Sequence, residues 1–363
     1  MNIPLIRHKR KLDRLAELGW NEKKTTEYIL KSVPVKPYKA GFGKSKTGML
    51  YKLGEGTDSI LLRADIDALK TEKGPKHICG HSSHTAALLQ TLTDTVRKLH
   101  NQPNRKNSVY FLFQPAEETY PSGAKAFIDE CPDVIKNLKY SFALHMRPLM
   151  KLREIGLQTG PVMARGDYFE INIRGTMAHI KNPEKGKDAI EAAAILIREF
   201  KAIQKKYFSV LRINVGVISG GRQSNTIADM CIMKGDVRLK ENRRQNFIKL
   251  LMEKAIKKAQ KSTGTAISLS YFDGYPVLSN EKAATGNVLR IMNNNNMLII
   301  RDGLFSFGCE DYSFISNLVP SAYAFIGTGD RHDIHHEKCI ISDAGTNAAY
   351  EYFSSLVSWW FNI

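Results

Sequence analysis

The stretch Asn107–Glu118, NSVYFLFQPAEE, determines the fold class of this chain, because it joins a buried strand to an acidic end. Its first eight residues are mostly apolar and aromatic and too few for a typical helix, which predicts a buried strand. Pro115 ends that strand, so Glu117 and Glu118 follow its carboxyl end directly. Polar side chains in this position are typical of ligand and catalytic sites in open sheets. The sequence therefore predicts an α/β fold with its chemistry at this edge.

The same pattern recurs on both sides of this stretch. Asp58–Asp67, DSILLRADID, and Leu138–His145, LKYSFALH, predict two further strands that end in polar residues. Ser83–His100 predicts a helix with serine and threonine near its start. Toward the end of the chain, Ala322–Gly329 predicts another strand, and a final helix is expected from about Asp343. The sequence therefore places α/β material at both ends of the chain.

The middle of the chain, residues 165–275, has a different pattern. Alternating strands are predicted over 167–175, 210–221, 226–238 and 265–273, and helices over 187–206 and 243–264. The resulting order, β-α-β-β-α-β, is typical of a ferredoxin-like domain. We therefore expect three segments, with 1–164 and 276–363 forming one large domain and 165–275 a small domain inserted between its halves.

Composition excludes several classes of protein. The chain has 363 residues, enough for two domains, and its apolar runs are too short for a membrane span. Five widely spaced cysteines and no recognisable signal peptide predict a cytoplasmic protein without disulfides. The net charge of +17 keeps nucleic-acid binding open as an alternative, but no zinc finger, RNP motif or recognition-helix pattern accompanies it.

Four short motifs carry side chains that bind transition metals. They are ICGHSSHTA (78–86), FQPAEE (113–118), ALHMRP (143–148) and DIHHE (333–337), and their candidate ligands are Cys79, His81, Glu118, His145 and His335. A thiolate, imidazoles and a carboxylate suit zinc, manganese or nickel, so the motifs together predict a binuclear metal site. Adjacent residues seldom ligate from one loop, so either His335 or His336 is the ligand. Of Glu117 and Glu118, a cation would hold one and leave the other as a base.

The order of these and further motifs along nearly the whole chain resembles the amidohydrolase branch of the aminoacylase/carboxypeptidase zinc metallopeptidases. That branch includes hippurate hydrolase, indole-3-acetyl-amino-acid hydrolases and N-acetyldiaminopimelate deacetylase. The supporting motifs include LLRADIDAL, CGHSSHTA, FLFQPAEE, SGAKAFI, ALHMRP, INIRGTMAH, VGVISGG, SNTIAD, CEDYSFI and IHHE. The resemblance implies a two-domain metallopeptidase with an α/β sandwich catalytic domain and an inserted ferredoxin-like lid and dimerisation domain.

The resemblance also implies a role for each site residue. Cys79, His81, Glu118, His145 and His335 would be the metal ligands. Glu117 would be the general base, and His179 of the RGTMAH motif would reach the substrate carbonyl, commonly from the partner subunit. Asn225 would contact substrate, whereas Arg238 would either pair with a substrate carboxylate or brace a strand.

The implied activity is hydrolysis of the amide bond of an N-acyl amino acid by two divalent ions, zinc, manganese, nickel or cobalt, in a homodimer formed through the small domain. A dipeptidase or carboxypeptidase of the same superfamily is one alternative, and a metal-binding homologue that has lost catalysis is another. Two departures from the family pattern bear on substrate choice and turnover. Ser82 replaces an aspartate, and the segment between Leu69 and Cys79 is short.

Overall fold

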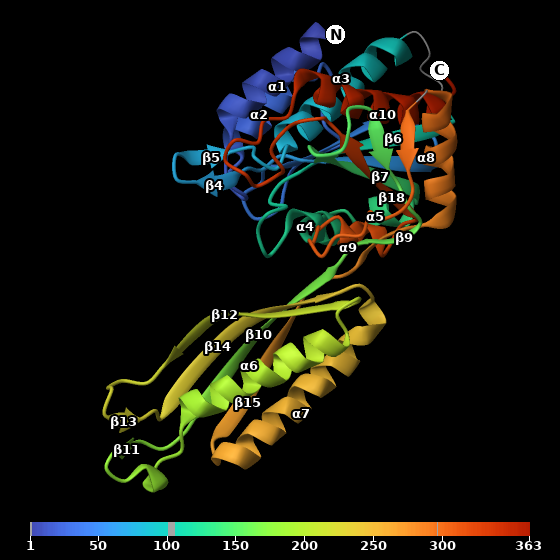
Figure 1. The fold of residues 1–363 in the computed structure, drawn as a ribbon. Coiled ribbons are helices and arrows are strands. Elements are labelled where there is room, and N and C mark those ends of the chain that lie inside the picture. Colours follow the sequence, from blue (N-terminus) through green and yellow to red (C-terminus); the bar gives the residue numbers. More distant parts are fainter. Residues whose placement is uncertain (1, 101–105, 296) are drawn as a thin grey trace. The chain divides into compact units, whose positions relative to one another are not determined.

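The computed structural model describes residues 2–100, 106–295 and 297–363. The chain forms two compact units (Figure 1). The first unit comprises Met1–Val162, Ser279–Leu304 and Asp311–Ile363, and the second comprises Met163–Leu278 and Phe305–Glu310. Among the described residues, no helix is both long enough and apolar enough to cross a membrane.

An eight-stranded sheet forms the centre of the first unit. In spatial order its strands are β1 (Lys39–Phe42), β2 (Gly48–Leu53), β6 (Asn107–Gln114), β3 (Asp58–Asp65), β7 (Leu138–Arg147), β18 (Ser321–Gly327), β8 (Glu154–Gly156) and β17 (Leu298–Ile300). The four central strands, β6, β3, β7 and β18, run parallel, so their carboxyl ends meet at one edge. Short strands elsewhere are β4 (Leu69–Thr71), β5 (Gly74–Lys76), β9 (Gly160–Met163) and β16 (Leu278–Asn280).

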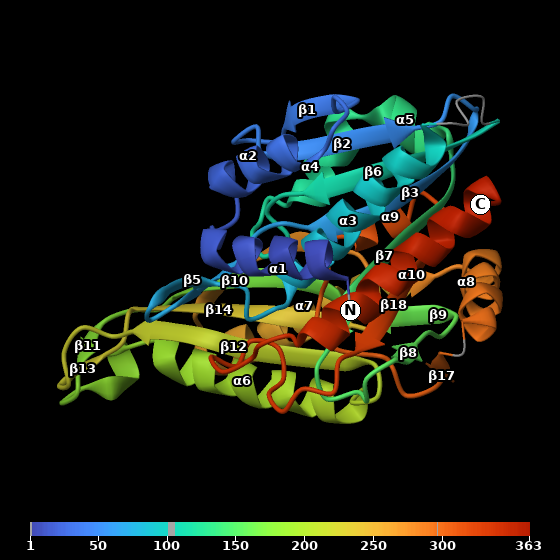
Figure 2. The ribbon, with the colours of Figure 1, turned by 90° about the horizontal axis from the view of Figure 1, so that it is seen from above.

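Helices cover both faces of this sheet (Figures 1 and 2). One face carries α1 (Ile3–Leu15), α2 (Lys23–Ser32), α3 (His81–Leu99), α8 (Lys282–Asn294) and α10 (Asp343–Phe361). The other carries α4 (Gly123–Glu130), α5 (Pro132–Lys136) and α9 (Ser313–Ser316). Because the central strands are buried on both sides, their sequences are nearly continuous apolar runs. The strands and helices predicted from the ends of the chain are confirmed.

The second unit has the predicted element order, β-α-β-β-α-β. Its elements are β10 (Arg165–Arg174), α6 (Ala189–Lys206), β12 (Leu211–Gly220), β14 (Met230–Leu239), α7 (Gln245–Thr263) and β15 (Ala266–Tyr275), with two short 3₁₀ helices at Pro183–Lys185 and Asn242–Arg244. The sheet is antiparallel, in the order β12-β14-β10-β15, and both helices pack against it. A separate two-stranded ribbon pairs β11 (Ala178–His179) with β13 (Thr226–Ile227). The role of lid and dimerisation domain stays a prediction for this unit.

The segment 305–310 belongs to the second unit, although it lies within the range 276–363 that the sequence assigns to the large domain. The Arg212 guanidinium stacks on the Phe307 ring at 3.9 Å, and Arg238 donates a hydrogen bond to Cys309. These contacts join positions about 70 to 100 residues apart in the sequence, so no local pattern predicts them.

Candidate metal centre

The glutamate pair is positioned by the turn that follows β6. Ala116 has a left-handed backbone, φ +51°, and its N–H donates to the buried carboxylate of Glu22 at 2.8 Å. Because of this turn, Glu117 and Glu118 lie at the edge of the sheet where the parallel strands end. The Glu118 N–H then donates to Asp67 Oδ2 at 3.0 Å, which fixes the backbone of the pair.

Cys79 and His81 lie on either side of a glycine that starts α3. Gly80 has φ +94°, and a Cβ there would lie 3.2 Å from side-chain atoms of Met146 and Ile341, so only glycine fits without strain. The turn leaves Cys79 in the loop and places His81 at the first position of the helix. Both side chains are buried, at 4% and 0% exposure.

The last two ligand candidates come from distant parts of the chain. His145 lies near the end of β7, and its Nδ1 bonds the Met146 carbonyl oxygen at 2.8 Å, which leaves Nε2 to face Cys79. His335 has a left-handed backbone, φ +68°, and its N–H donates to the Ile78 carbonyl at 2.9 Å. This hydrogen bond joins the His335 loop to the Cys79 loop.

The structure separates the two neighbouring histidines of the C-terminal motif. His335 Nε2 lies 3.2 Å from Cys79 Sγ. The His336 ring instead stacks on His332 at 4.5 Å, and its Nδ1 accepts the N–H of Lys338. Of the pair, His335 is therefore the residue placed at the centre.

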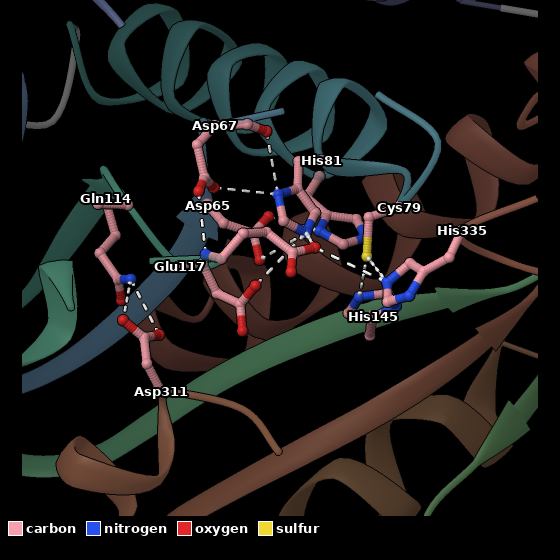
Figure 3. A network of polar contacts seen from close by, with 12 residues as sticks. Asp65, Asp67, Cys79, His81, Gln114, Glu117, His145, Asp311 and His335 are labelled. Carbon is pink, nitrogen blue, oxygen red and sulfur yellow. Dashed lines mark hydrogen bonds and ion pairs between the residues drawn. The ribbon is translucent and has the colours of Figure 1, made fainter. Parts of the chain in front are cut away.

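The candidate ligand atoms converge on one region (Figure 3). Cys79 Sγ lies 3.3 Å from His145 Nε2, and Glu118 Oε1 lies 3.7 Å from His335 Nε2. The distance from His81 Nε2 is 4.0 Å to Glu118 Oε1 and 3.9 Å to Glu117 Oε2. Two ligands of one tetrahedral zinc ion lie about 3.3–3.6 Å apart. The distance from Cys79 to His145 falls within this range, and the other three are slightly longer.

Three overlapping groups of these side chains could each hold an ion. They are Cys79–His81–His145, Cys79–Glu118–His335 and His81–Glu117–Glu118. Cys79 belongs to two of the groups, and a thiolate can bridge two ions. His81 Nε2 and Glu118 Oε1 are among the described side-chain atoms that are buried without a hydrogen bond, and such atoms are costly unless a ligand satisfies them. The donor set therefore fits transition metals.

The electrostatics of the centre favour a cation. Burial raises the pKa of the Cys79 thiol well above its usual value, and the charges of Glu118 and Glu117 raise it further. Burial opposes protonation of His81, but the carboxylates of Asp65 and Asp67 outweigh it and raise the pKa to about 10. Burial likewise raises the pKa of Glu118. Without metal, protons supply the positive charge that these acidic groups require, and divalent ions would displace them.

Sequence reasoning missed two acids that complete the centre, Asp65 and Asp67. Asp67 Oδ1 lies 3.2 Å from His81 Nδ1, and its other oxygen holds the Glu118 N–H, so one carboxylate orients two ligand residues. Asp65 Oδ2 lies 3.7 Å from His81 Nε2. Their position in the sequence could have identified them, because both residues lie at or just after the carboxyl end of β3, where sites occur in open sheets.

His179 and Asn225, two of the three remaining predicted site residues, lie together in the second unit. They are adjacent on the β11–β13 ribbon, where His179 pairs with Thr226 and the Ile180 N–H donates to the Asn225 carbonyl at 3.0 Å. Both are exposed. The Lys181 N–H donates to His179 Nδ1 at 3.0 Å, so only Nε2 of that ring faces outward unbonded within the ribbon.

Arg238 lies on β14 of the same unit and is already paired. Its Nε donates to Asp236 at 2.8 Å, and its Nη2 lies 2.8 Å from the same carboxylate. A further nitrogen bonds Cys309. These contacts favour the role of bracing a strand, and contact with a substrate carboxylate stays a prediction.

Comparison with known proteins agrees with this geometry. The model of peptidase family M20/M25/M40 matches residues 61–358. The chain is 31% identical to the N-acetyl-L-cysteine deacetylase of Bacillus subtilis, over 97% of this chain and 87% of that one. It is 27% identical to the N-acetyldiaminopimelate deacetylase of the same organism, over 92% of each chain.

Solved structures share the fold. A Bacillus subtilis protein described as a dinuclear metal binding peptidase from the M20 family superposes with a TM-score of 0.84 at 24% identity, covering 99% of this chain and 98% of that one. An aminopeptidase from Bacillus cereus superposes with a TM-score of 0.78 at 19% identity, covering 98% and 97%. With a family match over most of its length, this chain belongs to the peptidase family M20/M25/M40 and is a hydrolase.

Proposed function

We propose that the protein hydrolyses the amide bond of an N-acyl amino acid with two divalent metal ions. The observation that carries the proposal is the shared position of Cys79, whose Sγ belongs to two ligand groups beside the unbonded atoms His81 Nε2 and Glu118 Oε1. The named activities of the two Bacillus subtilis deacetylases support the substrate class. The ligands are Cys79, His81, Glu118, His145 and His335.

Glu117 is the proposed general base. Its carboxylate lies 3.9 Å from His81 Nε2, at the edge of the ligand set, and is 7% exposed. When bound, the two ions would activate water and stabilise developing negative charge. Glu117 accepts the proton of the attacking water and returns it to the leaving nitrogen, a transfer that typically contributes about 10²–10⁴ in rate.

His179 is proposed to donate a hydrogen bond to the oxyanion of the substrate. A backbone N–H only donates, so the contact from Lys181 makes Nδ1 the acceptor and places the proton of the neutral ring on Nε2. The exposed nitrogen is then a donor, as an oxyanion requires. Asn225 lies beside His179 and would contact the same substrate. Arg238 stays a candidate to pair with the carboxylate of the substrate.

We further infer a homodimer formed through the second unit. β12 is an edge strand of its sheet, and Val217 and Ile218 on it are 54% and 51% exposed. An unpaired apolar edge is a ready surface for pairing with a second copy. Light scattering on a sizing column should give a dimer, which Val217→Lys with Ile218→Lys converts to monomer. A monomeric native protein would contradict the inference.

Hydrolysis of a panel of N-acetyl and N-benzoyl amino acids tests the activity, including N-acetyldiaminopimelate and hippurate. The protein would be stripped of metal and reloaded with Zn²⁺, Mn²⁺, Ni²⁺ or Co²⁺. Two adjacent variants separate the roles of the glutamates. Glu117→Gln should keep two ions and lose about 10²–10⁴ in kcat, whereas Glu118→Gln should lose bound metal. Turnover without metal, or an active Glu117→Gln, would refute the proposal.

A further inference from the structure

A fully buried carboxylate–imidazole pair lies behind the metal centre. Asp65 Oδ1 and His84 Nδ1 are 2.6 Å apart, and the two side chains are 0% and 1% exposed. Neither residue is among the ligands assigned above. Burying a charged group this deeply costs free energy unless surrounding hydrogen bonds and charges compensate. The contacts of the pair are therefore the place to look for its role.

The bonding of His84 excludes it as a metal ligand. The Met146 backbone N–H donates to His84 Nε2 at 3.1 Å. Since that N–H can only donate, Nε2 is an acceptor, and the proton of the neutral ring lies on Nδ1, facing Asp65. Both ring nitrogens are therefore used, although Asp65, His81 and His84 lie close enough together to form a ligand group.

The same contacts connect the pair to two proposed ligands. Met146 follows His145, and its carbonyl oxygen bonds His145 Nδ1 at 2.8 Å, so His84 anchors, through the Met146 N–H, the backbone of the residue whose carbonyl orients this ring. The His84 ring also packs 4.9 Å from the His145 ring and 5.4 Å from the His81 ring, measured between centroids. His84 and His81 are three residues apart on α3 and so share one face of the helix.

A buried arginine holds the second oxygen of Asp65. Arg63 Nη1 lies 2.7 Å from Asp65 Oδ2, and both side chains are 0% exposed. The guanidinium is held in turn by Asp311 Oδ1 at 2.8 Å and Gln114 Oε1 at 2.9 Å. Asp65 Oδ2 is only 3.7 Å from His81 Nε2, so Arg63 competes with an ion for this oxygen.

We propose that Asp65 and His84 are a positioning pair that fixes His145 and His81 for metal binding, and that Arg63 keeps Asp65 from becoming a ligand itself. The inference rests on the metal centre of the proposed function. Partners that orient ligating histidines typically contribute about 10–100-fold in metal affinity. Asp65 and His84 therefore act on the metal through other side chains and need not touch substrate.

Two variants of His84 each remove one of its two hydrogen bonds and keep the other. His84→Asn can still donate to Asp65 but cannot accept from Met146, whereas His84→Gln can accept from Met146 but cannot reach Asp65 in the same way. Ser83→Ala is the control, because Ser83 is equally buried but bonds Thr346 at 2.9 Å, on α10. Co²⁺ is the probe, because its visible absorption reports ligand geometry.

Both His84 variants should bind Co²⁺ about 10–100-fold more weakly, with absorption bands shifted most in His84→Asn. Ser83→Ala should lower thermal stability and leave affinity and bands unchanged. Native affinity and native bands in both folded His84 variants would overturn the proposal.

If neither variant folds, ¹⁵N NMR of the metal-free native protein decides: a proton on His84 Nδ1 supports the pair, and a proton on Nε2 contradicts it. Failure to hydrolyse any N-acyl amino acid, with Co²⁺ bound tightly, would count against the proposed function alone.

Discussion

In the first unit, Cys79, His81 and His145 are between 0% and 7% exposed, whereas in the second unit His179 and Asn225 lie at the surface on a two-stranded ribbon. The buried set is held by the Met146 carbonyl, which bonds His145, and by the carboxylates of Asp65 and Asp67, which lie against His81. The exposed set lies on the β11–β13 ribbon, where the Asn182 N–H donates to the His179 carbonyl and the Ile180 N–H to the Asn225 carbonyl. This difference separates two tasks, because a metal centre needs preorganised buried ligands and a substrate contact needs an accessible donor. Variants in the two units should therefore fail differently.

The largest effect is expected from Cys79→Ala. Because Cys79 belongs to two ligand groups, its removal should lower the content of both ions and reduce hydrolysis by more than about 10³-fold. Metal analysis after dialysis, beside activity, measures both. Cys131→Ala, at a buried cysteine between α4 and α5, is the matched control and should keep its metal. Two retained ions in Cys79→Ala would contradict the assignment of Cys79 to both ligand groups.

His179→Gln should separate the two units most clearly. The loss of one oxyanion donor typically costs about 10²–10³ in kcat, and the metal content should stay native because His179 lies outside the first unit. Metal loss in this variant would contradict the division of tasks.

Co-expression of His179→Gln with Glu117→Gln tests whether His179 acts across a dimer. Each variant alone is nearly inactive, but a mixed dimer would contain one site with both native residues. Random mixing should then restore about a quarter of native activity. No recovery, in preparations shown to contain mixed dimers, would place His179 in its own subunit's site.

Glu22→Gln tests the buried support beneath the glutamate pair. Burial and the charge of Asp67 raise the pKa of Glu22 to about 7, above its ordinary 4.5. A raised carboxyl pKa gives stability that is present below about pH 4.5 and is lost as the pH rises through 7. In metal-free protein, Glu22→Gln should remove this loss and be more stable than the native chain at pH 8 by about 1–3 kcal/mol. Equal pH dependence in urea unfolding of both proteins would contradict the assignment.

The smallest effect is expected at Arg238. If its pairing with Asp236 braces β14, Arg238→Met should lower the free energy of unfolding by about 1–2 kcal/mol and change KM by less than about twofold. Asp236→Asn should then cost similar stability. A KM raised tenfold or more with native stability would instead assign Arg238 to the substrate carboxylate.

The five candidate ligand residues could be proposed from the sequence because each lies in a short motif of metal-binding residue types, and the structure brings these five side chains together. Residue types alone left His335 and His336 open and only the family resemblance favoured His335, because the position of its ring depends on the left-handed turn that bonds His335 to Ile78. The spacing of apolar residues likewise predicted the strands and the two helices of the second unit.

The supporting network escaped prediction for a different reason. Arg63 and Asp65 lie in the LLRADIDAL motif, but nothing local indicates their partners, because Arg63 pairs with Asp311, 248 residues away. Such pairing is a property of the folded sheet, where β3 and the segment after Glu310 meet. His84 stands in the CGHSSHTA motif without a predicted role, and the structure buries it between the rings of His81 and His145.

The most direct test is a crystal structure of the Zn²⁺-loaded protein with anomalous diffraction at the zinc edge. The account predicts two peaks in the first unit, both within bonding distance of Cys79 Sγ, with His335 rather than His336 beside one of them. A single peak, two peaks remote from Cys79, or zinc bound directly by Asp65 would contradict it.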